Sequence, residues 1–436
     1  MAGITFSGVP ALTPLTESNM TFFPDFFSLP IDWCTLFYGA GVGAAGLASV
    51  FTHEHSAGEV DVDTVKKRIA ELEKLSARSL EQNDELARLY SANAIALWDE
   101  GADLTEIVAL FVKAEVVLMA TLAQGDDVEV RRQLGNVYLN CAVALNDYDE
   151  LTSSVDYYLK GIDTLKPLDN SGDAEAKYDI AGMRLNLGNV YHELGEFEKA
   201  KTSLDESFLD FRAVEKIGVA DTRLFMAKVS VQQGHLLSDM GEAVGSIVDA
   251  HNRAMRLFIE VIEDQNLPEL ERDLAGALLA RCEALYTDCH EREFASEEER
   301  NTKIAEIQID IAQGVELLEK QYKSGNDLAR LDLFHGLVFQ GKVLCDIEQY
   351  VEAKEVLDRA INEFSDLCDG EGDDLFLMQM AVAYASRAVV QMGLGKPDLS
   401  KQDCMKGSEL VNKLLQEDSD DEDMQALREQ FQAMLE

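Results

Sequence analysis

From about residue 63 to the end of the chain, apolar residues recur at spacings of three and four, with only brief polar breaks between them. This spacing places apolar side chains on one face of each of a series of α-helices. Proline, the strongest helix breaker, is scarce over the same region: of 7 prolines, only Pro167, Pro268 and Pro397 lie beyond residue 31. The pattern therefore predicts an all-α fold.

A chain of 436 residues is long for one hydrophobic core, which favours several domains or an elongated repeat array. The clearest unit runs from Ala181 to Arg212 and predicts two antiparallel helices. Gly188 lets the two backbones approach closely, and Gly195 ends the first helix. Other residues that fit a helix pair in this unit are Tyr191, Phe197, Ala200 and Leu204.

Within that unit, the stretch LNLGNVYHELGEFEKAKTSL resembles the tetratricopeptide repeat family. A second strong copy covers Phe334 to Ala360. Weaker copies fall at 139–158, 227–254 and 384–407, and degenerate helix pairs at 83–123 and 268–323. The resemblance implies a right-handed α-solenoid of about seven antiparallel helix pairs over residues 63–416, in which each pair buries its apolar face against its neighbours. Corresponding positions recur at intervals of about 46 to 60 residues, longer than the family's about 34, so we expect extended helices or inserted loops.

In solenoids of this family, the first helix of each pair lines a concave groove that binds a peptide. An Asn or Gln side chain offers both an acceptor and a donor, so it can pair with a peptide backbone of any sequence. The alternative is that Asn136, Asn140, Asn186 and Asn189 are merely exposed or bond within their own helices. The family's carboxylate clamp is not matched. The family's register predicts these groove residues: Gln133, Asn136, Asn140, Asn186, Asn189, Lys228, Gln232, His235, His335 and Lys342.

Residues 1–60 differ from the rest because they contain no Lys or Arg. Trp33 to Phe51 is a stretch of 19 residues without a charge, long enough as a helix to cross a bilayer. Three interpretations stay open for residues 33–51: a transmembrane anchor, a helix docked in the solenoid, or disorder. If the segment spans a membrane, the basic residues Lys66, Lys67 and Arg68 place the solenoid on the cytoplasmic side.

The formal net charge is −43, from 81 acidic and 38 basic residues. This charge repels a phosphate backbone, so we expect no nucleic-acid partner. It either solvates a long surface or attracts basic proteins. Two interpretations also stay open for residues 417–436. They form either an acidic hinge before a capping helix at Met424 to Leu435 or a tail that binds basic ligands.

The 7 cysteines are scattered, which is typical of reduced thiols in a cytosolic-type compartment. Cys282 and Cys289 lie seven residues apart, about 10 Å along a helix, which is too far for two sulfurs on one zinc. We interpret both as packing residues, and His290, His53 and His55 complete no metal site. No motif of a phosphate loop, a metalloprotease or a nucleophile elbow is present.

The sequence thus predicts a protein that is not an enzyme and needs no cofactor or metal. Our leading hypothesis is an adaptor that binds a partner's peptide or helix in the concave groove. The chain would face the cytoplasm, either tethered to a membrane by residues 33–51 or free in the cytoplasm. The alternatives are an acidic chaperone or escort for basic proteins and, less favoured, a regulatory subunit of an enzyme.

Overall fold

The computed structural model describes residues 62–365, 374–417 and 422–435. These residues form sixteen α-helices and one short 3-10 helix, with no strand in the described ranges. The predicted all-α class is therefore confirmed. The helices are α3 (Val62–Glu73), α4 (Leu80–Asp99), α5 (Leu104–Leu122), α6 (Val128–Asp147), α7 (Leu151–Asn170), α8 (Ala174–Glu193), α9 (Phe197–Ile217), α10 (Arg223–Asp239), α11 (Val244–Gln265), η2 (Pro268–Leu270), α12 (Glu271–Glu291), α13 (Glu297–Lys323), α14 (Leu328–Asp346), α15 (Tyr350–Phe364), α16 (Asp374–Gly393), α17 (Pro397–Glu417) and α18 (Glu422–Leu435).

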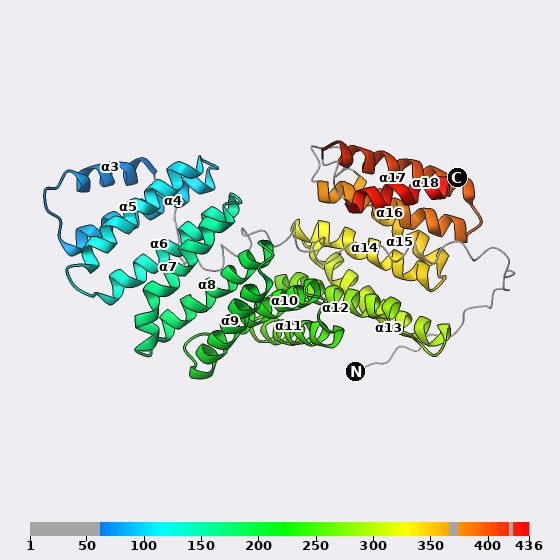
Figure 1. Ribbon diagram of the computed structural model, residues 1–436, viewed down its shortest axis with the longest axis horizontal. Coiled ribbons are helices and arrows are strands. Elements are labelled where there is room, and N and C mark those ends of the chain that lie inside the picture. Colours follow the sequence, from blue (N-terminus) through cyan, green and yellow to red (C-terminus); the bar gives the residue numbers. More distant parts are fainter. Residues whose placement is uncertain (1–61, 366–373, 418–421, 436) are drawn as a thin grey trace.

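Fourteen of these helices form seven consecutive pairs, from α4 and α5 to α16 and α17. The first helices are α4, α6, α8, α10, α12, α14 and α16, and the helix that follows each of them is called the second helix of its pair. Each second helix packs on its own first helix, and the second helices from α5 to α15 also pack on the first helix of the next pair. Figure 1 shows the pairs following one another along a curved array, so the predicted solenoid of about seven pairs is confirmed.

Long helices account for the long repeat. The paired helices contain 15 to 27 residues, of which α15 is the shortest and α13 the longest. The connections are short in comparison: residues 148–150 join α6 to α7, and residues 194–196 join α8 to α9. Of the two expected causes of the long repeat interval, extended helices therefore contribute most.

Glycines fix the distance between the two helices of several pairs. A Cβ atom on Gly188 of α8 would lie 2.7 Å from Cγ of Leu204 on α9, which is closer than side chains approach. The same contact joins Gly135 to Leu165 and Gly341 to Leu357. The expectation that Gly188 lies at a close helix crossing is thus confirmed.

The turns between first and second helices share one backbone geometry. Gly195 has φ +71°, and the amide groups of residues 195 and 196 donate to the carbonyl groups of residues 192 and 191. This is the left-handed helix ending that glycine favours, as the sequence predicts. At the same point of two other turns, Asp149 and Glu348 adopt φ 60° without being glycine.

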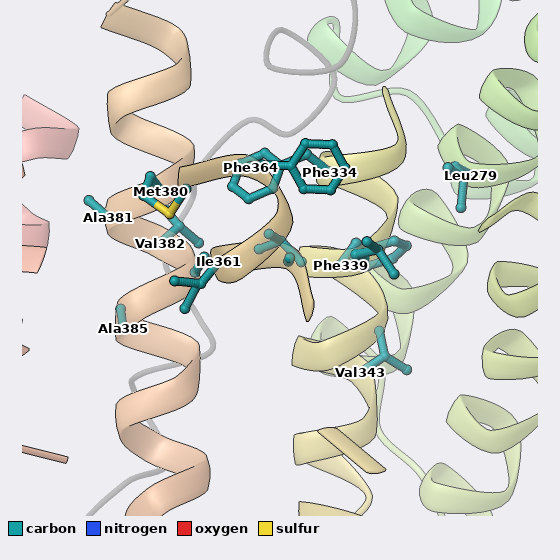
Figure 2. Close-up of a cluster of buried hydrophobic side chains, with 14 of the residues drawn as sticks. Leu279, Phe334, Phe339, Val343, Ile361, Phe364, Met380, Ala381, Val382 and Ala385 are labelled. Atoms are coloured by element: carbon teal, nitrogen blue, oxygen red, sulfur yellow. The ribbon is translucent and has the colours of Figure 1, made fainter. Parts of the chain in front are cut away.

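The core is distributed along the array as a series of hydrophobic clusters rather than gathered at one centre. Figure 2 shows one section of it, where Phe334 of α14 meets Phe364 of α15 with ring centroids 5.5 Å apart. At the C-terminal end, α18 packs on α17, and its Phe431 is fully buried beside Gly407. The predicted C-terminal capping helix is confirmed.

The five cysteines in the described part of the chain are all buried as free thiols. Cys282 and Cys289 belong to the core cluster of α12 to α18, as their interpretation as packing residues requires. Among the described residues, no helix is both long and apolar enough to cross a membrane. Residues 33–51, on which the anchor prediction rests, lie outside the described residues, as do His53 and His55.

Candidate binding face on the first helices

The first helices form one side of the array. Each first helix contacts the first helix of the next pair, whereas second helices contact mainly the first helices that flank them. In Figure 1, α10 and α12 lie on the inner side of the curve, and α11 and α13 lie on the outer side. Side chains that protrude from successive first helices therefore share one inner face.

Helix α6 contributes a stripe of three amide side chains to this face. Asp127 caps the helix by accepting hydrogen bonds from the backbone amides of Glu129 and Val130, which sets where its first turn begins. Gln133, Asn136 and Asn140 follow at spacings of three and four, so they lie on one side of α6. All three are partly exposed.

On α8, the two predicted residues differ in depth. Asn189 is partly exposed, but Asn186 is only 5% exposed and hydrogen-bonds with Tyr158 of α7, which is fully buried. Asn186 therefore belongs to the packing between α7 and α8, whereas the alternative considered for it was an exposed side chain or a hydrogen bond within its own helix. A ligand would reach Asn189 first.

The predicted residues of α10 and α14 lie in a charged and tightly packed region. Lys228, Gln232 and Lys342 are partly exposed. Burial lowers the pKa of Lys342 to about 8, against the opposing attraction of Glu283 and Asp346. Burial also lowers the pKa of Lys228, which Asp273 partly offsets.

Both predicted histidines are buried. The ring of His235 on α10 meets that of His251 on α11 edge to face, with centroids 5.2 Å apart. Burial and the nearby His251 keep the pKa of His235 well below its usual range. His335 on α14 is 1% exposed, and burial lowers its pKa to about 3. Because both rings are neutral and buried, they contribute to the packing of the helices and are not accessible to a ligand.

Sequence reasoning missed the acidic residues of α12, which lie between the two lysines in space. Asp273 faces Lys228 of α10, and Glu283 faces Lys342 of α14. Arg272 extends this network, because its Nε donates to Oδ2 of Asp332 at 2.5 Å. The α12 copy of the repeat is too degenerate to assign its register, so no sequence signal pointed to these carboxylates.

Comparison with known proteins finds one family whose sequence model matches part of this chain. Residues 181–208, on α8 and the first half of α9, match the sequence model described as tetratricopeptide repeat. The helix pair α8–α9 contains a tetratricopeptide repeat. No curated protein matches the chain.

Solved structures of other helical-repeat proteins resemble the chain at low sequence identity. They include the apo form of RapI, with TM-score 0.47, 12% identity, and coverage of 76% of this chain and 99% of that one. BtubC from P. vanneervenii has TM-score 0.45, 14% identity, and coverage of 60% and 91%. A tetratricopeptide repeat protein from Parabacteroides merdae has TM-score 0.41, 12% identity, and coverage of 79% and 98%.

The tetratricopeptide repeat and the pair before it carry amide groups that the fold leaves unsatisfied. Among the described residues, neither amide atom of Gln133 has a hydrogen-bond partner, and neither do the carbonyl oxygens of Asn186 and Asn189. These atoms are shielded from solvent. Buried polar atoms without partners are uncommon in folded proteins and call for an explanation. Such atoms also occur elsewhere in the described residues, for example on Gln379 of α16, but on the candidate face they lie on the two adjacent first helices α6 and α8.

No group of three or more His, Cys, Asp and Glu side chains in the described ranges is arranged to hold a metal ion. His290 instead lies beside Arg300 and Asp346, with its Nε2 3.2 Å from Oδ2 of Asp346. Its neighbours Cys282 and Cys289 point into the core, and burial raises the pKa of both thiols.

Proposed function

We propose that this protein is an adaptor that binds an extended peptide segment of a partner protein along the first helices α6, α8 and α10. The observation that carries the proposal is the group of partnerless amide atoms on Gln133 and Asn189, in adjacent pairs of the array. Asn136, Asn140 and Gln232 extend the same face as partly exposed amides.

A buried amide group without a partner costs about 1 to 3 kcal/mol. A peptide backbone supplies donors and acceptors at regular intervals, so it can satisfy such groups regardless of its own sequence. The terminal torsions of Gln133 and Asn189 turn easily, which lets both amides reorient toward a bound strand. Binding a peptide would thus satisfy amide groups whose missing hydrogen bonds destabilise the free protein.

Charge contributes less to this proposed site than the sequence suggests. Lys228 and Lys342 face carboxylates of α12, so their charges are already balanced within the protein. We therefore place the recognition on the amide residues of α6, α8 and α10 rather than on the lysines. A ligand held by backbone hydrogen bonds should respond weakly to salt.

The test starts with a random peptide library, displayed on phage and selected on the immobilised full chain. Affinities of recovered peptides are measured by fluorescence anisotropy at 50 and 300 mM salt. Replacing Gln133 and Asn189 by Ala should weaken binding by about tenfold, because each lost hydrogen bond contributes about 0.5 to 1.5 kcal/mol. Asn362→Ala, an exposed amide on α15, is the matched control and should leave affinity unchanged.

Two results would contradict the proposal. One is an affinity that does not change in the double variant. The other is binding that is strong at 50 mM salt and lost at 300 mM, which would favour the acidic escort for basic proteins that the net charge of −43 also allows.

A further inference from the structure

Helix α5, the second helix of the first pair, exposes an apolar stripe on its outer side. The stripe consists of Ala109, Val112, Val116 and Met119. The exposed fractions of Val112, Val116 and Met119 are 38%, 61% and 52%. These residues follow one another at spacings of three and four, so they form one continuous face. The opposite side of α5 packs into the core through Ile107, Phe111, Ala114 and Leu118.

The second helices of the next five pairs differ from α5 at the same positions. Alignment of the buried residues places the stripe of α5 on Asp156, Leu159, Asp163 and Lys166 of α7. The corresponding positions of α9, α11, α13 and α15 each include at least two charged residues, whereas α5 has none. The uncharged apolar face is therefore absent from these five helices and is not a general property of the repeat.

Helix α5 thus carries apolar residues on its outward side as well as on its core side, beside the exposed charges of Glu106 and Lys113, and apolar residues on two opposite sides are typical of a buried helix. End units of a repeat array normally present a polar surface to water. Helix α3 covers part of this end of the array, but it packs on α4 and leaves the stripe of α5 exposed. A contiguous exposed apolar face marks a site that another surface covers.

We propose that residues 33–51 of the same chain cover the α5 stripe. This segment has no charged residue and matches α5 in length, since both contain 19 residues. The ten residues 52–61 connect it to Val62, where α3 begins, and can span about 33 Å. Helix α5 is about 28 Å long, and α3 shares one hydrophobic cluster with it. The connecting residues can therefore span a distance longer than the helix that carries the stripe.

The two surfaces also match in side-chain size and charge. Gly39, Gly43 and Gly46 allow a partner to approach the segment closely, and Ala109 and Ala120 offer small exposed side chains on α5. Residues 33–51 and the four stripe residues carry no charge that would lose its hydration on contact, and Lys113, which borders the stripe, pairs with Glu73 of α3 at 3.9 Å. The local linkage makes this contact effectively intramolecular, which favours it over a second molecule at ordinary concentrations.

The direct test places the photo-crosslinking residue p-benzoylphenylalanine at position 116 of the full chain. After irradiation, mass spectrometry should find the crosslink in residues 33–51 of the same molecule. Mixing isotopically light and heavy chains separates crosslinks within one molecule from those between two. Position 209 on α9 is the matched control, because Leu209 occupies the position of Val116 and is 59% exposed; it should give no such crosslink.

A second measurement uses Cys34, which lies within the covering segment, and needs no artificial residue. Val116→Asp should raise the rate of maleimide labelling at Cys34 several-fold in the full chain, whereas Leu209→Asp should leave it unchanged. The substituted side chains are both about 60% exposed, so both variants should fold, and circular dichroism checks this. The five buried cysteines serve as an internal reference for intact structure.

The same experiments give a different result if the α5 stripe is covered by something other than residues 33–51. Crosslinks between light and heavy chains would assign the stripe to a second copy of the protein and overturn the proposal. Flotation of the full chain with phosphatidylcholine vesicles, together with loss of the crosslink to residues 33–51, would place that segment in a membrane instead. Equal crosslinking from positions 116 and 209 would show that the contact is not specific to α5.

Discussion

Gly188 lies at a close contact between α8 and α9, and it gives the first prediction. Gly188→Leu should lower the free energy of unfolding by about 1 to 3 kcal/mol, because the new side chain meets Leu204 at the crossing. Urea denaturation followed by circular dichroism measures the change. Gly245→Ala on α11 is the control, since a Cβ there meets nothing within 4 Å and should not destabilise the protein. Equal stability of Gly188→Leu and the wild type would exclude a tight crossing at this residue.

Lys342 predicts a specific dependence of stability on pH. Burial lowers its pKa from 10.5 to about 8 in the folded chain, whereas the unfolded chain keeps the ordinary value. Between pH 8 and 10.5 the unfolded state therefore binds more protons, so this group makes the protein more stable as pH rises.

The Lys342→Met variant isolates that contribution from the many other titrating groups. The free energy of unfolding of the wild type, relative to the variant, should increase between pH 7.5 and pH 9.5. Urea denaturation at the two pH values gives the difference directly. A difference that stays constant would mean that Lys342 keeps an ordinary pKa in the folded protein.

At the scale of helices and turns, Asp149 and Glu348, the non-glycine residues with positive φ in turns between a first and a second helix, offer a way to stabilise the fold. Glu348 adopts φ 60° in the turn between α14 and α15, a conformation that costs a non-glycine residue about 1 to 2 kcal/mol. Glu348→Gly should therefore raise the midpoint of thermal unfolding. The reverse change at the same place in another turn, Gly195→Ala, should lower it. A lower melting temperature for Glu348→Gly would show that the turn is not strained.

The arrangement of helices could be predicted from the sequence because its determinants are local. Gly188 and Gly341, with the aromatic and small residues around them, mark two pairs, and weaker or degenerate copies of the same pattern indicate the other five. The turn glycine Gly195 and the capping helix at the C-terminus follow from the same local chemistry. Each of these features depends on residues that are close together in the sequence.

The sequence did not predict how deeply each residue of the candidate site is buried, or which residues of other helices it interacts with. The repeat register identifies the face of a helix on which a residue lies, but it does not show how far the neighbouring helix covers that face. Asn186 and His335 are therefore buried although the register places them toward the groove. The contact between Lys342 and Glu283 joins residues 59 positions apart, from two different pairs, and depends on how those pairs stack.

For the whole molecule, a solenoid predicts unfolding that is local rather than global, because each pair is stabilised mainly by its neighbours. Phe431 of α18 is fully buried against α17, so Phe431→Ala should cost about 3 to 5 kcal/mol at that end. Hydrogen exchange measured by mass spectrometry should become faster in α17 and α18 and stay unchanged in α4 to α7. Uniformly faster exchange along the chain would indicate a single cooperative unit.

The division of contacts between inner and outer helices has a mechanical consequence. First helices touch along the inner side of the curve, while second helices are held mainly through the first helices beside them. We therefore expect neighbouring pairs to tilt slightly against one another about the inner row, which would change the spacing of the second helices. Small changes at each of the seven pairs add up along the array, so the protein should be elastic, with the separation of its two ends set by the sum of these tilts. A ligand bound across several first helices would restrict this tilting and fix the distance between the two ends of the array.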